Sequence, residues 1–367
     1  MTIDAPARFH WFLPTSGDGR AIVGASHASS HQVLPDGYRP PTRRYLAEVA
    51  RAADRLGYEG VLTPTGTWCE DAWLTASALL AETERLKFLV AFRPGLVPPT
   101  LAAQQAATLQ RFSEGRVLLN IVSGGDDVEQ RRFGDWLGHD ERYARTGEFL
   151  HVVKAIWGQG GVDFEGRYYT VKDARVSSPP DPLPGIYFGG SSPAALPIAA
   201  EYADVYLTWG EPPQDAAAKL AKVRDLAAAR GRHVRFGIRL HTISPDTSAA
   251  AWAVADELLA GLSDEHIARQ TALHAASESE GQRRMTALHG GRRDGLEIYP
   301  NLWAGVGLVR GGAGTALVGS HQEVANLIYE YHSLGSDEFI LSGYPHLEEA
   351  HWFAEGVLPL LRQKGVA

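Results

Sequence analysis

Two side chains near the C-terminus could handle a proton at the end of one strand. The apolar run Glu338–Ser342 reads as a short strand, and the Gly-Tyr-Pro-His turn that follows it carries Tyr344 and His346. A phenol can donate or accept a hydrogen bond, and an imidazole can take up or release a proton near neutral pH. The pattern therefore predicts that one strand delivers two candidate acid–base groups at its C-terminal end.

Two basic side chains share one face of another expected strand. Arg239 and His241 lie two residues apart in the run Phe236–His241, and the alternation of side chains along a strand puts both on the same face. Buried cations need a partner or a ligand, which favours a pocket. The alternative is a core arginine paired with a carboxylate, beside a core histidine whose hydrogen bonds are satisfied.

Other strand ends carry groups that could hold an anion or a ring. Arg310 stands in a glycine-rich turn, where the backbone can approach a ligand closely and a guanidinium can meet an oxyanion. Trp209 ends another expected strand. The run Phe-Gly-Gly-Ser-Ser-Pro contains Ser191 and Ser192, and a helix starting there would offer N–H groups and hydroxyls to a phosphate. The ordinary interpretations are a solvated loop arginine, a core tryptophan and a serine N-cap.

The hydrophobic pattern predicts a scaffold that brings these strand ends together. Apolar runs typical of buried parallel strands alternate with stretches that have apolar residues at helical spacing. The expected strands are Phe9–Leu13, Gly60–Thr65, Lys87–Arg93, Arg116–Val122, Gly185–Phe188, Asp204–Thr208, Arg235–Thr242 and Glu338–Ser342. The expected helices include Arg43–Leu56, Asp71–Leu86, Glu141–Ile156, Pro213–Ala229 and His321–Leu334. Eight such units predict a (β/α)8 TIM barrel, whose active site lies at the C-terminal ends of its strands.

Two irregular segments interrupt the barrel pattern. We expect one domain over residues 1–367, with insertions at about 17–41 and about 249–301. The second insertion begins with two helical stretches and ends in Glu278–Asn301, which is rich in arginine and glycine and is predicted to be a loop. Loops of that length in a compact domain are usually functional, and we expect residues 278–301 to act as a lid.

Composition narrows the class of protein. The chain has 44% hydrophobic residues and a net charge of −8, so nucleic acid is not an expected partner. The chain has no membrane-length apolar run and no signal-peptide pattern, which predicts a cytoplasmic protein with no membrane partner. Cys69 is the single cysteine and the 14 histidines are mostly scattered, so no metal site is expected. The dinucleotide-binding glycine fingerprint and the hydrolase nucleophile elbow are both missing from the sequence.

Taken together, five segments resemble the FMNH2-dependent alkanesulfonate monooxygenases, which are bacterial-luciferase-like flavin monooxygenases. The segments are Phe12–Gly19, Pro64–Asp71, Phe236–His241, Pro300–Thr315 and Leu341–Glu349. The resemblance implies a two-component enzyme in which a separate NAD(P)H-dependent flavin reductase supplies FMNH2. With O2 as co-substrate, such an enzyme cleaves the C–S bond of an organosulfonate and releases sulfite and an aldehyde. The resemblance also implies a homodimer or homotetramer.

The same resemblance implies roles for individual residues. The catalytic positions are Arg239, His241, Tyr344 and His346. The substrate-binding positions are Trp209, Arg310, Cys69 and Ser16. The cofactor-binding positions are Asn120, Tyr143, Gly190, Ser191 and Ser192.

Two departures from the family pattern bear on the substrate. Ser16 stands where these enzymes usually have histidine, and the longer Arg20–Pro41 segment adds hydroxyl and imidazole groups, namely Ser26, His27, Ser29, Ser30 and His31. Both changes favour a bulky hydroxylated sulfonate, so the sulfoquinovose monooxygenase branch is expected. The alternatives are an alkanesulfonate or methanesulfonate monooxygenase, a catalytically silent flavin-binding relative and a deazaflavin-dependent barrel oxidoreductase.

Overall fold

The eight predicted strands close into a barrel in the computed structural model, which describes residues 6–22 and 37–367. In chain order they are β1 (Arg8–Phe12), β2 (Gly60–Thr63), β3 (Lys87–Phe92), β4 (Val117–Ile121), β7 (Gly185–Gly189), β8 (Val205–Trp209), β9 (Arg235–Ile243) and β13 (Glu338–Ser342). Each strand pairs in parallel with the next, and β13 pairs with β1 to complete the ring. The TIM-barrel prediction is therefore confirmed.

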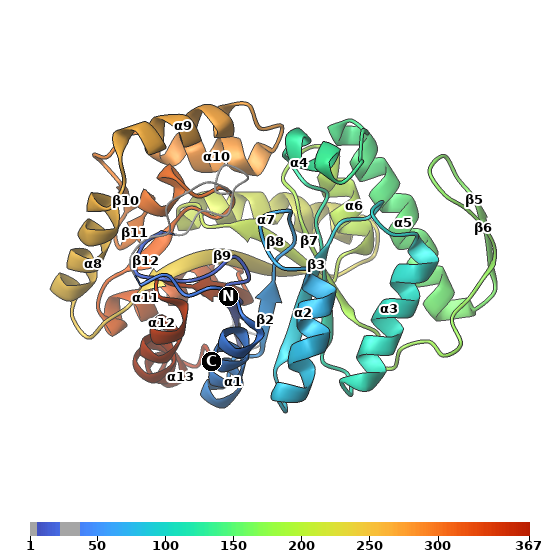
Figure 1. Ribbon diagram of the computed structural model, residues 1–367, viewed down its shortest axis with the longest axis horizontal. Coiled ribbons are helices and arrows are strands. Elements are labelled where there is room, and N and C mark those ends of the chain that lie inside the picture. The colour runs from blue at the N-terminus through green and yellow to red at the C-terminus, as the bar shows by residue number, and fades with distance from the viewer. Residues whose placement is uncertain (1–5, 23–36) are drawn as a thin grey trace.

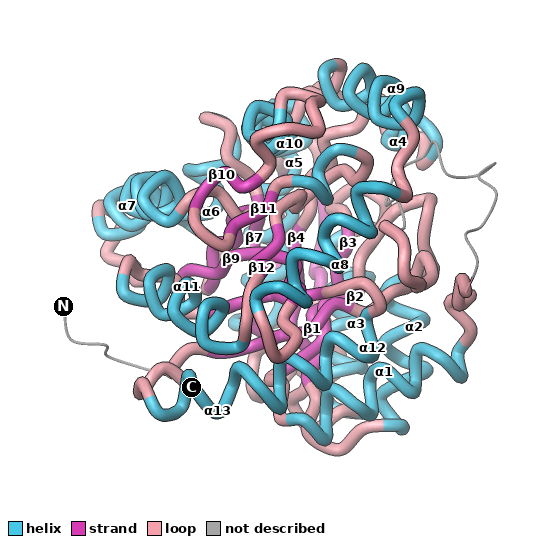
Figure 2. The backbone as a smooth tube through the Cα atoms, turned by 90° about the vertical axis from the view of Figure 1, so that its left-hand side faces the viewer, coloured by secondary structure: helices cyan, strands magenta, loops and turns pink. Residues whose placement is uncertain are grey.

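Helices form a layer outside the strands, as two perpendicular views show (Figure 1, Figure 2). They are α1 (Arg43–Leu56), α2 (Ala72–Leu79), α3 (Pro99–Phe112), α4 (Asp127–Arg132), α5 (His139–Gln159), α6 (Ala195–Tyr202), α7 (Pro213–Ala228), α11 (His321–Ser333), α12 (His346–Trp352) and α13 (Leu358–Gln363). Helix α1 covers the predicted residues because Thr42 caps its N-terminus and Gly57 ends it in the left-handed conformation. Within the described ranges, the structure contains no helix of the length and hydrophobicity that crossing a membrane requires.

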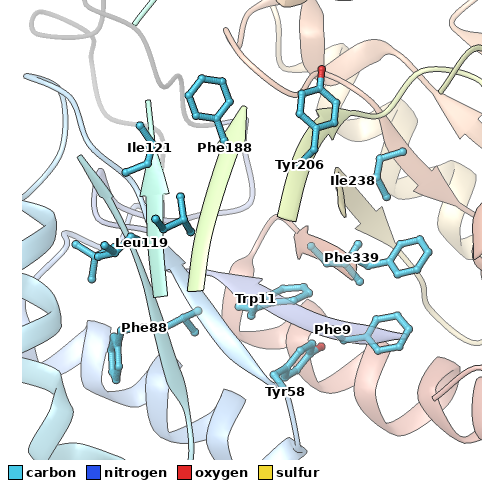
Figure 3. Packing of buried hydrophobic residues seen from close by; sticks show 14 of the residues in the cluster. Phe9, Trp11, Tyr58, Phe88, Leu119, Ile121, Phe188, Tyr206, Ile238 and Phe339 are labelled. Carbon is cyan, nitrogen blue, oxygen red and sulfur yellow. The ribbon is translucent and has the colours of Figure 1, made fainter. Parts of the chain in front are cut away.

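Side-chain alternation divides each strand between the barrel interior and the helical layer. Phe9, Trp11 and Phe339 belong to the large apolar cluster between strands and helices (Figure 3). Phe12 and Ile340 belong to a smaller cluster of inward-facing residues. Residues paired across neighbouring strands share a face of the sheet. The strand register therefore decides which polar side chains enter the barrel.

The register of β9 and β13 places the predicted polar pair in the barrel interior. Arg239 is paired with Ile340, and His241 is paired with Ser342. Since Ile340 faces inward, the other three side chains face inward as well. The prediction that Arg239 and His241 lie on one face of a strand is confirmed.

The second insertion differs from the prediction in one respect. Its first part forms α8 (Ser248–Ala260) and α9 (Asp264–Ala275), as expected, but residues 278–301 are not a continuous loop. They contain the helix α10 (Glu280–His289) and the strand β10 (Glu297–Tyr299), which leads into β11 (Leu302–Trp303) and β12 (Ala316–Val318). The helix has clear limits, because Ser279 caps its start and Gly290 ends it with a positive φ of 57°.

Two smaller features complete the fold. A hairpin of β5 (Val162–Glu165) and β6 (Thr170–Ala174) projects from the side of the barrel near α5 (Figure 1). In the first insertion, an antiparallel bridge joins Asp18 to Arg39, and residues 23–36 lie outside the described residues. The described ends of this insertion are therefore held together next to β1.

Candidate active site

Two adjoining cavities lie at the C-terminal ends of the barrel strands. The first, which we call the serine cavity, is lined by residues that include Asn120, His139, Tyr143, Gly190, Ser191 and Ser192. The second, the arginine cavity, is lined by residues that include Phe12, Trp68, Gln282, Arg310 and Ala313. Both are lined by Leu62, Gly125, Trp209, Arg239 and Ser279. The cavities thus share a wall, and Arg239 belongs to it.

The serine cavity is shaped by a turn between β7 and α6. Gly190 has a φ of 151°, and a Cβ atom built on it would lie 2.8 Å from the hydroxyl of Tyr143. The turn is fixed from outside by Tyr206, whose hydroxyl donates to the Gly190 carbonyl over 2.9 Å. Glycine is therefore the residue that lets the backbone approach Tyr143 this closely.

Several hydrogen-bonding groups in the lining of the serine cavity lie at the start of α6. Ser191 and Ser192 precede α6, and the Ser192 hydroxyl accepts from the Ala195 amide at 3.3 Å. Burial raises the pKa of Tyr143, although bonds to Ser192 and Ser123 oppose the rise, so the phenol stays protonated and can donate. Hydroxyls beside a helix N-terminus suit a phosphate.

Other residues in the lining of the serine cavity suit a flat ring. Leu62 and Ile340 are apolar, while Asn120 and Arg239 add an amide and a cation. A cavity that combines groups for a phosphate with an apolar lining and a few polar groups fits flavin mononucleotide. The predicted cofactor-binding residues Asn120, Tyr143, Gly190, Ser191 and Ser192 all line this one cavity.

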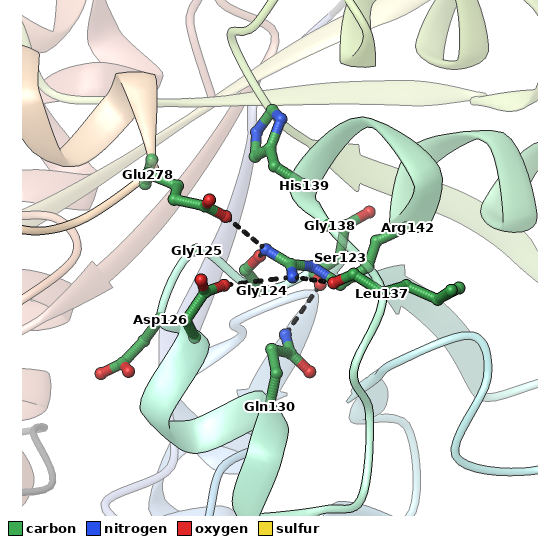
Figure 4. A network of polar contacts seen from close by, with 12 residues as sticks. Ser123, Gly124, Gly125, Asp126, Gln130, Leu137, Gly138, His139, Arg142 and Glu278 are labelled. Carbon is green, nitrogen blue, oxygen red and sulfur yellow. Dashed lines mark hydrogen bonds and ion pairs between the residues drawn. The ribbon is translucent and has the colours of Figure 1, made fainter.

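A buried arginine links the serine cavity to the second insertion. Arg142, on α5 beside Tyr143, donates to the carbonyl of Leu137 at 2.6 Å and pairs with Glu278 at 3.0 Å. It also pairs with Asp127 at the start of α4, at 3.2 Å. Figure 4 shows Arg142 at the centre of this network, with Glu278 approaching from the insertion. The residue that begins the predicted lid is thus tied to the helix that carries Tyr143.

Helix α10 forms part of the cavity walls. Gly281 lies so close to Trp209 that a Cβ atom on it would come within 2.9 Å of the indole. Ser279, Glu280, Gly281 and Met285 line the serine cavity, and Gln282 lines the arginine cavity. Arg284 pairs with the buried carboxylate of Glu211, which also holds Lys219. Trp209 therefore lies between the barrel and the helix that covers it.

Two arginines face one phenylalanine in the arginine cavity. The guanidinium carbons of Arg239 and Arg310 lie 4.7 Å and 5.5 Å from the centre of the Phe12 ring. Both residues are buried. Their hydrogen bonds go to carbonyls and hydroxyls, and across residues 6–22 and 37–367 neither guanidinium forms an ion pair with a carboxylate. Burial, and then the charge of Arg310, lower the pKa of Arg239. Two buried cations without a counter-charge create a strong requirement for an anion.

The polar residues on β9 and β13 form a chain behind Arg239. An Nη2 of Arg239 donates to the Ser342 hydroxyl at 2.8 Å, and that hydroxyl lies 2.8 Å from Nδ1 of His241. Nε2 of His241 lies 3.1 Å from the Ala313 carbonyl. Burial, together with the charges of Arg239 and Arg310, lowers the pKa of His241, so this imidazole is neutral at ordinary pH.

Tyr344 and His346 pack next to this chain. The Tyr344 ring stacks on His241 with 5.5 Å between ring centres, and it meets His346 edge-on at 5.3 Å. Arg310 lies close enough to exchange a hydrogen bond with the phenol. The structure therefore brings together five predicted residues, namely Arg239, His241, Arg310, Tyr344 and His346.

Asp18 is a buried neighbour of the predicted site residue His346 that sequence reasoning missed. Its carboxylate accepts from Nδ1 of His346 at 2.9 Å and from the His346 amide, and the hydroxyl of Tyr45 donates to it. Burial alone would raise the pKa of Asp18, but the charge and hydrogen bonds of His346 and the bond from Tyr45 lower it to about 2. Its place in a Thr-Ser-Gly-Asp turn after β1 is the only signal in the sequence.

Two predicted substrate-binding residues line neither of these two cavities. The thiol of Cys69 faces the carbonyls of Pro64 and Gly66 at 3.7 Å and 3.6 Å, and burial raises its pKa to about 12. The Ser16 carbonyl accepts from the hydroxyl of Tyr38 at 3.0 Å. Of the proposed polar loop residues, Ser26, His27, Ser29, Ser30 and His31 lie outside the described residues.

The chain belongs to the luciferase-like monooxygenase family, whose model matches residues 7–338. Among solved structures, riboflavin lyase RcaE superposes with a TM-score of 0.81 at 21% identity, covering 99% of this chain and 93% of that chain. Long-chain alkane monooxygenase LadA gives 0.77 at 18% identity, with 100% and 93% covered. DmoA from Hyphomicrobium sulfonivorans gives 0.77 at 21% identity, with 99% and 89% covered. At these identities the structural likeness establishes the fold, while the family match establishes the class of flavin-dependent monooxygenases.

Proposed function

We propose that the protein is a two-component, reduced-flavin-dependent monooxygenase that oxidatively cleaves the C–S bond of an organosulfonate. The observation that carries the proposal is the pair Arg239 and Arg310, buried against Phe12 without a carboxylate partner in the described parts of the chain. A sulfonate is a permanent anion with three oxygens, and the planar fork of a guanidinium matches such a group better than an ammonium does.

The reaction is balanced by one molecule each of sulfonate, O2 and FMNH2. One oxygen atom enters the aldehyde that replaces the C–S bond, the other leaves as water, and sulfite and oxidised FMN are the remaining products. Reduced FMN supplies the two electrons and the position at which O2 is activated. The proposal assigns the supply of FMNH2 to a separate NAD(P)H-dependent flavin reductase, which is in keeping with the missing dinucleotide fingerprint.

The chain's own residues have three tasks in this proposal. Arg239, in the wall shared by the two cavities, and Arg310, in the arginine cavity, bind and orient the sulfonate. Tyr344, which is protonated because burial raises its pKa, donates a hydrogen bond or a proton to the oxygen that takes up charge. Helix α10, packed on Trp209, keeps water away from the shared wall.

Within this class we favour sulfoquinovose, a sulfonated sugar, as the substrate. Support comes from the arginine cavity, whose wall includes the polar side chains of Asp126, Asp127, Gln270 and Gln282. A site built to bind hydroxyls rejects analogues that lack them, because its own polar groups are then left unpaired. The side chain of Ser16 does not line this cavity, so it no longer supports the preference.

The proposal is tested by measuring sulfite release side by side from sulfoquinovose, methanesulfonate, octanesulfonate and taurine. FMNH2 comes from an added flavin reductase, and oxidised FMN alone serves as the control. We expect release of sulfite and consumption of one equivalent of O2, with the highest kcat/KM for sulfoquinovose.

A clear preference for a linear alkanesulfonate would overturn the sugar assignment and leave C–S cleavage standing. No sulfite from any sulfonate would identify a silent flavin-binding relative, and tight binding of a deazaflavin without preference for FMNH2 would identify the other oxidoreductase class.

A further inference from the structure

Ser342 is a buried hydroxyl that links two predicted site residues. It is the last residue of β13 and has no exposed surface. Its oxygen lies 2.8 Å from Nη2 of Arg239 and 2.8 Å from Nδ1 of His241. Both partners come from β9, so the Ser342 side chain joins the last strand of the barrel to both of them, while the Ile340 carbonyl contacts Arg239 only.

The partners of His241 fix the direction of each hydrogen bond in the series that joins Arg239, Ser342, His241 and Ala313. Nε2 faces the Ala313 carbonyl, which can only accept, so Nε2 carries the hydrogen. In the neutral imidazole Nδ1 is then an acceptor, and it must accept from the Ser342 hydroxyl. The serine oxygen keeps its lone pairs for Arg239, which can only donate. The four groups therefore have one consistent arrangement of donors and acceptors.

The Ala313 carbonyl, at the other end of this hydrogen-bonded series, also contacts the second arginine. The Ala313 carbonyl that accepts from His241 also lies 3.4 Å from Nη1 of Arg310. A continuous set of contacts thus runs from Arg239 through Ser342, His241 and Ala313 to Arg310. This set, together with the carbonyls of Leu240, Ile340 and Gly311, holds both guanidinium groups beside Phe12. Among residues 6–22 and 37–367, no carboxylate forms an ion pair with either group.

We propose that Ser342 is a positioning residue that sets the guanidinium of Arg239 for sulfonate binding by joining it to His241 and the Ala313 carbonyl. The identity of the anion in this inference rests on the proposed function. The inference gives His241 a role as a neutral spacer with Nε2 protonated. It also explains how two like charges keep a defined geometry before any anion arrives.

The first test compares Ser342→Ala with Ser342→Thr, which keeps the hydroxyl. Binding of sulfoquinovose and octanesulfonate to the FMN-bound enzyme is measured by calorimetry, and binding of FMN is measured separately. Because a hydrogen bond to a charged group is lost, we expect Ser342→Ala to weaken sulfonate binding about tenfold or more, and Ser342→Thr to restore it. FMN affinity should fall much less than sulfonate affinity, since Tyr143, Ser191 and Ser192 keep their contacts in the serine cavity although Arg239 also lines it.

A double-mutant cycle separates positioning from general support of the fold. If Ser342 acts through Arg239, adding Ser342→Ala to Arg239→Ala should change the residual sulfonate affinity less than about twofold. The inference is overturned if Ser342→Ala weakens sulfonate binding equally in the Arg239→Ala background, or if it weakens FMN binding as much as sulfonate binding.

A measurement without substrate keeps the two proposals distinguishable. Nitrogen-15 NMR of labelled histidines, with His241→Asn to assign the signal, should report a neutral His241 protonated at Nε2 in the unliganded enzyme. Ser342→Ala should shift its Nδ1 resonance. A His241 protonated at Nδ1 would overturn the inference even if sulfonates are substrates. Wild-type enzyme that shows this tautomer but binds no sulfonate would overturn only the proposed function.

Discussion

At the scale of single residues, Arg239 is the group whose environment is hardest to explain without a ligand. It is buried, it lies near a second arginine, and burial and the neighbouring charge both lower its pKa. An anion bound between the two guanidinium groups would stabilise their charged forms and raise the pKa of Arg239 again. The residue is therefore the first target for mutation.

Replacing Arg239 should remove sulfonate turnover. Truncating one partner of a buried, hydrogen-bonded charge pair costs about 2–5 kcal/mol, so we expect Arg239→Ala to lower kcat/KM by on the order of a hundredfold or more. Arg239→Lys should also lose most activity, because an ammonium lacks the planar fork. Steady-state sulfite assays measure both, with the exposed Arg44 changed to alanine as a matched control. Normal turnover by Arg239→Ala would exclude this residue from the site.

Removing the hydroxyl of Tyr344 should lower kcat. General acid–base assistance contributes about 10²–10⁴-fold, so Tyr344→Phe, which removes only the hydroxyl, should lower kcat within that range. His346→Ala should also lower kcat, because it removes the partner that Asp18 holds beside Tyr344. His241→Ala should act mainly on sulfonate affinity. If all three variants keep the wild-type kcat in rapid-quench and steady-state assays, none of these side chains handles the proton.

At the scale of elements, α10 is the part of the second insertion that meets the site. The sequence predicts a loop here because the segment is rich in arginine and glycine, yet the structure has a capped helix. Its arginines mostly find partners within the protein, such as Glu280 for Arg283 and Glu211 for Arg284. The lid function expected for this segment would therefore require helix α10 to move and the ion pair between Arg284 and Glu211 to open.

Ligand binding should protect α10 from proteolysis. Trypsin cleaves after arginine and lysine, so Arg283, Arg284 and Arg292 report on the opening of this segment. We expect slower cleavage there when FMN and a sulfonate are both bound, because the closed helix excludes the protease. Lys172, exposed in the β5–β6 hairpin, is an internal control whose cleavage should not change. Equal cleavage rates at α10 with and without ligands, measured by mass spectrometry, would argue against a lid.

At the scale of the whole molecule, one buried carboxyl should make stability depend on pH. Burial raises the pKa of Glu349 from 4.5 to about 7, although its bonds to Ser244 and Thr242 oppose the rise. Below pH 4.5 the group is protonated in both the folded and the unfolded protein, so it imposes no penalty. Between pH 4.5 and about 7 the unfolded chain ionises first, so the free energy of unfolding falls as pH rises.

Glu349→Gln should remove this pH dependence. The amide keeps an acceptor for the Ser244 amide and hydroxyl but cannot ionise, so the variant should be more stable than wild type at pH 8 and should lose that advantage at pH 4.5 and below. Thermal unfolding followed by circular dichroism at several pH values measures the difference. Asp18, whose pKa is lowered to about 2, acts only at more acidic pH and does not interfere. A constant difference between variant and wild type from pH 4 to pH 8 would contradict the assignment.

The sequence by itself determined the barrel strands and the face that Arg239 and His241 share. Apolar runs and helical stripes are local patterns, so all eight barrel strands and the inward position of Arg239 and His241 could be predicted from them. The family resemblance then assigned roles to residues that the structure gathers around two cavities. Five predicted residues line neither cavity: Cys69, Ser16, His241, Tyr344 and His346. The last three pack together behind Arg239 instead.

Tertiary structure alone decided the contacts between distant parts of the chain. Asp18 and His346 are separated by 328 positions, and Ser342 and His241 by 101, so no local pattern marks either pair. They meet because the last strand closes the barrel against the first and against β9. The packing of α10 on Trp209 has the same origin. Periodicity reports which way a side chain faces, whereas the partner it meets depends on how the whole sheet closes.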